Sequence, residues 1–209
     1  MSRDETVFKT ALRSTGYFCA MNKSLTDAYD IDEAYPSWVV LIHWVTVALV
    51  LLAAGAVLGR ELVEDRSLRA ALMIVHRGAG LMVLAVTLLR LAVSPWVIHR
   101  KATPTTPLLK TGALLSHLSL YLVLLANPIV GWALSSARGQ VAYFLGVIAL
   151  PSLVAKDRDF ADTLQEAHES VAIALLVIVA LHSAAALWHH FIRRDAVLLR
   201  MTALRKARG

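Results

Sequence analysis

Four histidines lie inside long apolar stretches of this sequence. His168 and His182 are fourteen residues apart in AHESVAIALLVIVALHSAAALWHHF, and His43 and His76 lie in two other apolar segments. An ionisable group inside a hydrocarbon layer is costly and usually functional, and imidazole is a common metal ligand. Two imidazoles on facing helices can supply the two axial ligands of a haem iron. The four histidines therefore predict two metal-centred cofactors within a membrane.

The composition favours a membrane protein of the all-α class. Of the 209 residues 57% are hydrophobic and 17% are charged, and the mean hydropathy is +0.61. Soluble domains carry about 25% charged residues. Four apolar segments have the roughly 20 residues that a spanning helix needs, which predicts an integral membrane four-helix bundle. They run over 38–58, 70–93, 112–134 and 168–192. A shorter apolar stretch, 141–154, is predicted to be an interfacial or re-entrant piece.

The two polar tails set the limits of the domain, and the cysteine content and net charge exclude other classes of protein. We expect a polar, flexible cytoplasmic tail over 1–34, the bundle over 35–194 and a basic cytoplasmic tail over 195–209. Met21 is a second plausible start. One cysteine, Cys19, and the absence of a CxxCH motif exclude intrachain disulfides and covalent haem attachment. The net charge of +6 is spread over segment ends, so nucleic-acid binding is not expected.

Lysine and arginine predict the orientation. Fourteen of the 21 lie on the side of the two tails and of the connection between the second and third segments, counting Arg90 at the end of the second segment and Arg193 and Arg194 at the end of the fourth. The other seven lie on the opposite side. The positive-inside rule then places both termini in the cytoplasm. His43 and His182 fall toward the cytoplasmic side, and His76 and His168 toward the outside, since fourteen helical residues advance about 21 Å. Matched depth predicts the pairs His43–His182 and His76–His168, whereas four separately hydrogen-bonded histidines explain the match less well.

Several motifs resemble the bacterial cytochrome b561 family over residues 35 to 201. They are LIHW with a preceding Tyr35, VHRGAG, SHLSLYLVLLANPIVGW, and AHES followed by LHSAAALWHHF and LLRM. The resemblance implies a four-helix protein of the bacterial inner membrane with two b haems. It also implies ligand roles at the positions of the same four histidines. The chain departs from relatives at Leu114, where a second histidine is common, without consequence for ligation.

Other residues are candidates for contact with the cofactors. His117 is interpreted either as a partner of a haem propionate or quinone, or as an interfacial helix-end residue. His189 shares a helix face with His182 and is expected at a haem edge. Arg77 and Arg138 are candidate propionate partners or anion attractors.

The resemblance and the histidines together lead to an expected function. We expect single-electron transfer across the bilayer to or from ubiquinone or another quinone, with superoxide as a small anionic donor, as in related superoxide:quinone oxidoreductases. A cationic funnel of Arg77, Arg138 and Arg158 would then steer the anion. An anchoring subunit for a soluble dehydrogenase or hydrogenase is the alternative, and a haem-free transporter or scaffold is a third. A homodimer remains open.

Overall fold

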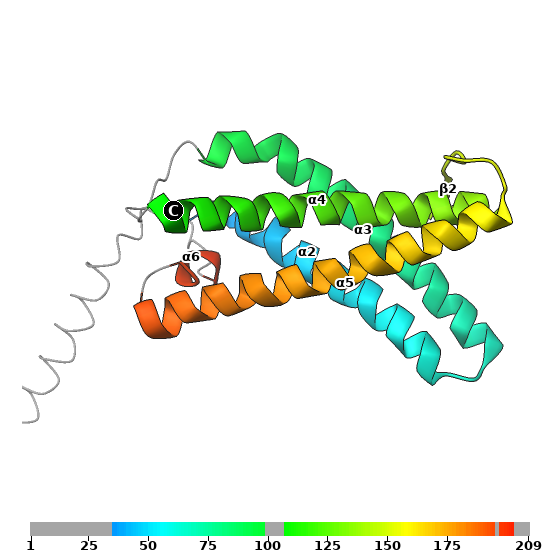
Figure 1. The fold of residues 1–209 in the computed structure, drawn as a ribbon, viewed down its shortest axis with the longest axis horizontal. Helices are drawn as coiled ribbons and strands as arrows, with labels where there is room; N and C mark the ends of the chain where they lie inside the picture. Colours follow the sequence, from blue (N-terminus) through cyan, green and yellow to red (C-terminus); the bar gives the residue numbers. More distant parts are fainter. Residues whose placement is uncertain (1–34, 99–106, 195–196, 203–209) are drawn as a thin grey trace, which may run out of the picture.

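The computed structural model describes residues 35–98, 107–194 and 197–202, and four long helices dominate them (Figure 1). All four are long and apolar enough to cross a membrane, which confirms the expected all-α membrane bundle. They are α2 (Ser37–Leu62), α3 (Arg66–Ile98), α4 (Pro107–Ala137) and α5 (Arg158–Trp188).

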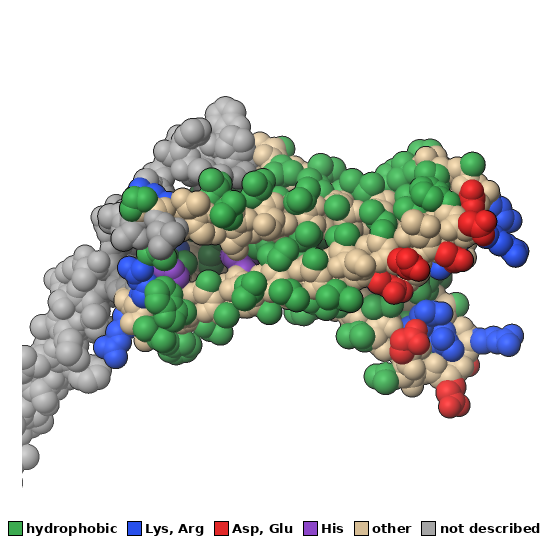
Figure 2. All heavy atoms as spheres, viewed as in Figure 1, with side chains coloured by type: hydrophobic (Ala, Val, Ile, Leu, Met, Phe, Trp, Pro, Cys, Tyr) green, Lys and Arg blue, Asp and Glu red, His purple; other side chains and the backbone are tan. Residues whose placement is uncertain are grey.

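Consecutive helices pack together, so the chain runs up and down through the bundle. Helices α4 and α5 lie side by side, and α2 and α3 form a second pair that crosses them (Figure 1). The core is small and is built around Val83, Leu124 and Leu175, one from each of α3, α4 and α5. Many large apolar side chains point outward, such as Leu51 and Ile74, which are 67% and 68% exposed. Hydrophobic side chains cover the length of the bundle while charges collect at its ends, as lipid contact requires (Figure 2).

One end of the bundle carries the α2–α3 turn and a β-hairpin, and we call it the hairpin end. Asp65 caps α3 there, because its Oδ1 accepts from the backbone N–H of Leu68 at 2.8 Å and from the Ser67 hydroxyl at 2.5 Å. These hydrogen bonds favour the carboxylate and lower the pKa of Asp65. The apolar stretch expected at the interface forms the hairpin, in which β1 (Tyr143–Phe144) pairs antiparallel with β2 (Ile148–Ala149).

Helix α5 starts earlier than the sequence suggested. The fourth apolar segment was expected over 168–192, whereas α5 already begins at Arg158. Asp157 is the N-cap of α5 and its side chain accepts from the Phe160 N–H at 3.0 Å. Carboxylates near a helix N-terminus are favourable, so the acidic run over 157–169 starts a helix rather than opposing one. His168 therefore lies ten residues inside α5 and not at its first turn.

The opposite end of the bundle holds the short helix α6 (Leu199–Thr202), and we call it the α6 end. Helix α5 continues there into a π-helical turn, η2 (His189–Arg193), which ends at Arg194 with a φ of 53°. The Trp44 indole N–H donates to the Met201 carbonyl at 2.9 Å. This bond ties α6 to α2, close in sequence to His43.

Candidate cofactor site

His76 and His168 face each other between α3 and α5 in the half of the bundle toward the hairpin end. Their ring centroids are 6.0 Å apart and their planes are at 89°. Both rings are half-buried. The structure therefore brings together the pair that depth matching predicted for this side of the membrane.

The backbone of the other two helices fixes both rings. His76 Nδ1 lies 2.9 Å from the Ala53 carbonyl oxygen of α2, and His168 Nδ1 lies 3.1 Å from the Asn127 carbonyl oxygen of α4. A carbonyl oxygen only accepts, so each Nδ1 carries the proton and donates. Nε2 of each ring then keeps its lone pair for a metal, in the arrangement that orients most histidine ligands.

The spacing of the two rings leaves room for a metal ion between them. A metal–nitrogen bond of roughly 2 Å on each side, plus about 1 Å from nitrogen to ring centre, predicts centroids about 6 Å apart. The observed 6.0 Å agrees with this. The donor set, two neutral imidazoles with Nε2 available, is also the one that a b-type haem uses.

Gly131 of α4 allows this arrangement by its lack of a side chain. A Cβ at Gly131 would lie 3.0 Å from Cε1 and 3.3 Å from Nδ1 of His168. One turn earlier, the buried Oδ1 of Asn127 has no hydrogen-bond partner in the described part of the chain. An unsatisfied buried acceptor beside the two facing histidines is typical of a site that holds a further group or water.

Three histidines gather toward the α6 end. The rings of His117 and His182 are 5.6 Å apart at 66°, and Ser116 Oγ lies 3.5 Å from His182 Nδ1. His43 is within electrostatic range of both rings. The sequence paired His43 with His182, and the structure adds His117 at the same level. The assignment of two ligands among these three stays a prediction.

Arg90 of α3 belongs to this same region, and the sequence analysis assigned it no role. Its charge acts on His43, His117 and His182, and its guanidinium lies 5.7 Å from the centroid of the Tyr121 ring. A cation inside a membrane-spanning helix is stabilised by a partner such as this aromatic ring. Its position in an apolar segment was the signal that could have identified it.

A cavity of about 570 Å³ opens at the hairpin end. It is lined by Arg60, Arg66, Arg69, Ala70, Met73, Ile74, Arg77, Arg138 and Gln140. We predicted a cationic funnel that included Arg158, but this residue does not line the cavity. The three additional arginines come from the end of α2 and the start of α3. Their clustering on the side with fewer basic residues was the sequence signal that pointed to them.

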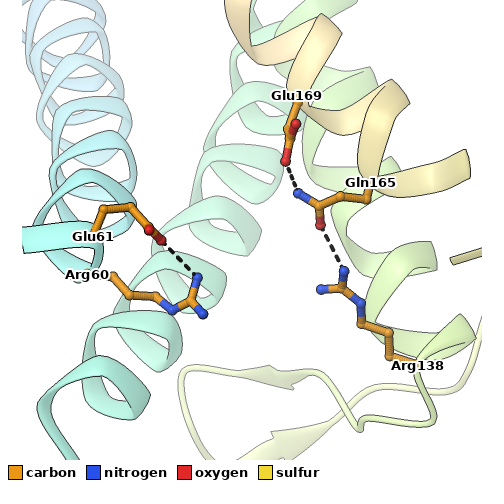
Figure 3. A network of polar contacts seen from close by, with 5 residues as sticks. All are labelled: Arg60, Glu61, Arg138, Gln165 and Glu169. Atoms are coloured by element: carbon orange, nitrogen blue, oxygen red, sulfur yellow. Dashed lines mark hydrogen bonds and ion pairs between the residues drawn. The ribbon is translucent and has the colours of Figure 1, made fainter. Parts of the chain in front are cut away.

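Two arginines of the cavity are held by amide groups. Arg77 Nη2 donates to Gln140 Oε1 at 2.5 Å, and Arg138 Nη2 donates to Gln165 Oε1 at 3.1 Å. The Gln165 amide in turn donates to Glu169, as Figure 3 shows. Both guanidinium groups are thus positioned on the same side as the His76–His168 pair. The predicted propionate role of Arg77 and Arg138 stays a prediction.

His189 lies at the junction of α5 and η2, toward the α6 end of the bundle. Its ring packs edge-on against Trp188, with centroids 5.3 Å apart. Its predicted contact with a haem edge also stays a prediction.

No sequence signal could have identified the backbone carbonyls of Ala53 and Asn127 as partners of His76 and His168, because every residue carries a carbonyl group.

A membrane-spanning four-helix bundle with facing intramembrane histidines is the arrangement that membrane cytochromes b use to hold haem. The chain belongs to the prokaryotic cytochrome b561 family, whose model matches residues 34–203. It is 31% identical to the "Probable superoxide oxidase CybB" of Yersinia pestis over 80% of this chain and 94% of that protein. It is equally 31% identical to the "Cytochrome b561 homolog 1" of Escherichia coli (strain K12), over 80% of this chain and 96% of the relative.

A second Escherichia coli relative, "Cytochrome b561 homolog 2", is 34% identical over 46% of this chain and 51% of its own length. Membership of the family implies binding of b-type haem and electron transfer in a membrane. The chain is accordingly a multi-pass bacterial membrane protein.

Proposed function

We propose that the chain binds two b haems and passes single electrons across the bilayer between an outside donor and quinone. His76 and His168 would hold the haem toward the hairpin end, and His43 and His182 would hold the haem toward the α6 end. The observation that carries the proposal is that the His76 and His168 rings face each other with centroids 6.0 Å apart, each with Nδ1 hydrogen-bonded to a backbone carbonyl oxygen.

A bis-imidazole b haem supplies reversible one-electron chemistry. The role of the protein would be to hold two such haems at different depths in the membrane. His168 and His182 share helix α5 and are fourteen residues apart, which is about 21 Å along the axis. A continuous helix fixes this spacing, so the two sites together cover much of the roughly 30 Å hydrocarbon layer.

Superoxide is the donor that we favour at the hairpin end. The cavity there contains Arg77 and Arg138, and lies on the side of the His76–His168 pair. A cleft lined by one sign of charge raises the local concentration of the opposite ion and its rate of arrival. The Yersinia pestis relative is named as a probable superoxide oxidase, which supports the same donor. Two superoxide ions oxidised to O₂ would reduce one quinone, with two protons, to quinol.

Quinone would react at the α6 end, where His117 and Arg90 lie near His182. Both side chains can donate a hydrogen bond to a quinone carbonyl. In this proposal the membrane is the bacterial inner membrane and the α6 end faces the cytoplasm. Superoxide is then oxidised at the hairpin end, on the outer side of that membrane.

Haem content and the reduced-minus-oxidised visible spectrum of the purified protein test the proposal. We expect two haems per chain, and one in each of the single variants His76→Ala and His43→Ala. A protein with one haem, or a His76→Ala variant that keeps two, would contradict the ligand assignment.

Rapid mixing of the oxidised protein with superoxide tests the donor. Haem reduction should be fast, should slow as ionic strength rises, and should slow further in Arg138→Gln. Arg158→Gln removes the same charge at the same end outside the cavity, and serves as the control. The donor assignment is wrong if superoxide leaves the haems oxidised, and co-purification of a soluble dehydrogenase would then favour an anchoring subunit.

A further inference from the structure

The cavity at the hairpin end carries more positive charge than its protein partners neutralise. Among the residues that the structure describes, only one carboxylate pairs with any of its arginines, Glu61 with Arg60 at 3.2 Å (Figure 3). Two more arginines donate to the neutral amides of Gln140 and Gln165. Like charges this close repel one another, so an anion in the cavity would stabilise the arrangement.

Three of the lining arginines lie next to the α2–α3 turn, and one of them, Arg60, is the partner of Glu61. Arg66 is exposed, and Arg60 and Arg69 are half-buried. All three follow or precede the short α2–α3 turn, so the turn gathers them on one wall. They line the same cavity as Arg77 and Arg138, whose guanidinium groups already donate to glutamine side chains.

Superoxide would occupy only a small part of this cavity and would neutralise only one of its positive charges. A volume of about 570 Å³ lies within the range of pockets that hold small molecules, roughly 300–1,000 Å³. A diatomic anion takes up on the order of one or two water volumes, about 30–60 Å³. It also brings a single negative charge. A larger anion with several acceptor oxygens fits both properties better.

The rest of the lining points to the edge of the membrane. Ala70, Met73 and Ile74 form an apolar strip of α3 beside the arginines, and Ile74 is 68% exposed on a helix long enough to span the bilayer. An anionic group with an apolar attachment could therefore enter from the lipid side. The guanidinium fork matches the oxygens of a phosphate group with two parallel hydrogen bonds.

We propose that this cavity binds a phosphate group, held by Arg60, Arg66 and Arg69. Its source is either the headgroup of an anionic phospholipid or inorganic phosphate. Neither source depends on the proposed electron transfer, because these three arginines lie outside the histidine pairs. Phosphate in the cavity would compete with other anions for the same wall.

Two binding measurements on the purified haem-loaded protein separate the sources. In lipid-free detergent, inorganic phosphate is titrated calorimetrically against the protein, with chloride keeping the ionic strength constant. In nanodiscs, the thermal midpoint is compared between phosphatidylcholine alone and phosphatidylcholine with phosphatidylglycerol, and retained lipid is identified by native mass spectrometry. Specific binding to the folded state raises the thermal midpoint.

The variants are Arg69→Gln, with Arg66→Gln as a second in case the first does not fold, and Arg158→Gln as the control of equal charge. We expect Arg69→Gln to weaken binding about tenfold, as loss of a charge-assisted hydrogen bond does, and Arg158→Gln to change it less than twofold. Haem content of each variant reports whether it is folded.

Phosphate binding in detergent supports the inorganic source, and stabilisation by phosphatidylglycerol with retention of that lipid supports the lipid source. Equal weakening by Arg158→Gln overturns the proposal, because the effect would then be general attraction to a basic surface. Absence of both phosphate binding and phosphatidylglycerol stabilisation in the wild-type protein overturns it as well.

Discussion

Replacement of Gly131 by alanine tests whether the His168 ring is held for ligation. Alanine in a helix interior is normally favoured over glycine by about 1 kcal/mol. Here the new Cβ would lie 3.0 Å from Cε1 and 3.3 Å from Nδ1 of His168, closer than ordinary van der Waals contact. The ring cannot yield easily, because Nδ1 is bonded to the Asn127 carbonyl oxygen at 3.1 Å. Overpacking of this kind costs about 1–3 kcal/mol, which outweighs the helix gain in most of its range.

The expected result is a selective loss of one haem. Displacement of a ligand from its supporting hydrogen bond lowers metal affinity by about 10- to 100-fold. Haem quantitation of Gly131→Ala after dialysis should therefore fall from two per chain toward one, with one bis-histidine signal retained in the spectrum. Gly112→Ala in the same helix is the control, because a Cβ there has no neighbour within 4 Å. The reasoning is refuted if Gly131→Ala keeps both haems with unchanged affinity.

Three further predictions concern other parts of the bundle. His117→Ala should keep two haems per chain by haem quantitation. If His117→Ala lost one haem and His43→Ala kept both, His117 and not His43 would be the ligand. Asp65→Ala should lower the thermal midpoint, and since hydrogen bonds depress the pKa of Asp65, its stabilising effect should be present at neutral pH and be lost as the pH falls below about 4. Asp65→Asn should keep the cap without that pH dependence, and a midpoint equally pH-dependent in both proteins would contradict this. Trp44→Phe removes the bond to the Met201 carbonyl, so amide exchange in α6 should speed up several-fold by mass spectrometry, and unchanged exchange would show that other contacts hold α6.

The sequence determined the class of the fold because the bilayer leaves few choices. A segment such as 38–58, with almost no charge, must satisfy its backbone internally, and a helix is the local way to do so. Helical spacing then placed His168 and His182 at separate depths, since the rise per residue is fixed. Apolar composition did not show where α5 begins, because most of its first ten residues are polar or charged and the helix is capped by Asp157.

Only the tertiary structure decided which groups surround each imidazole. The carbonyls of Ala53 and Asn127 are chemically like all others, and they become partners of His76 and His168 only because the helices pack at one particular register. Gly131 acquires its role in the same way, through the approach of α5 to α4. Likewise, Arg60 and Arg69 become one charged wall because the α2–α3 turn brings them together. The rise along a helix fixes the depth of a residue in the membrane. The rotation and packing of the helices fix which residues contact one another, and the sequence encodes these contacts only through the whole fold.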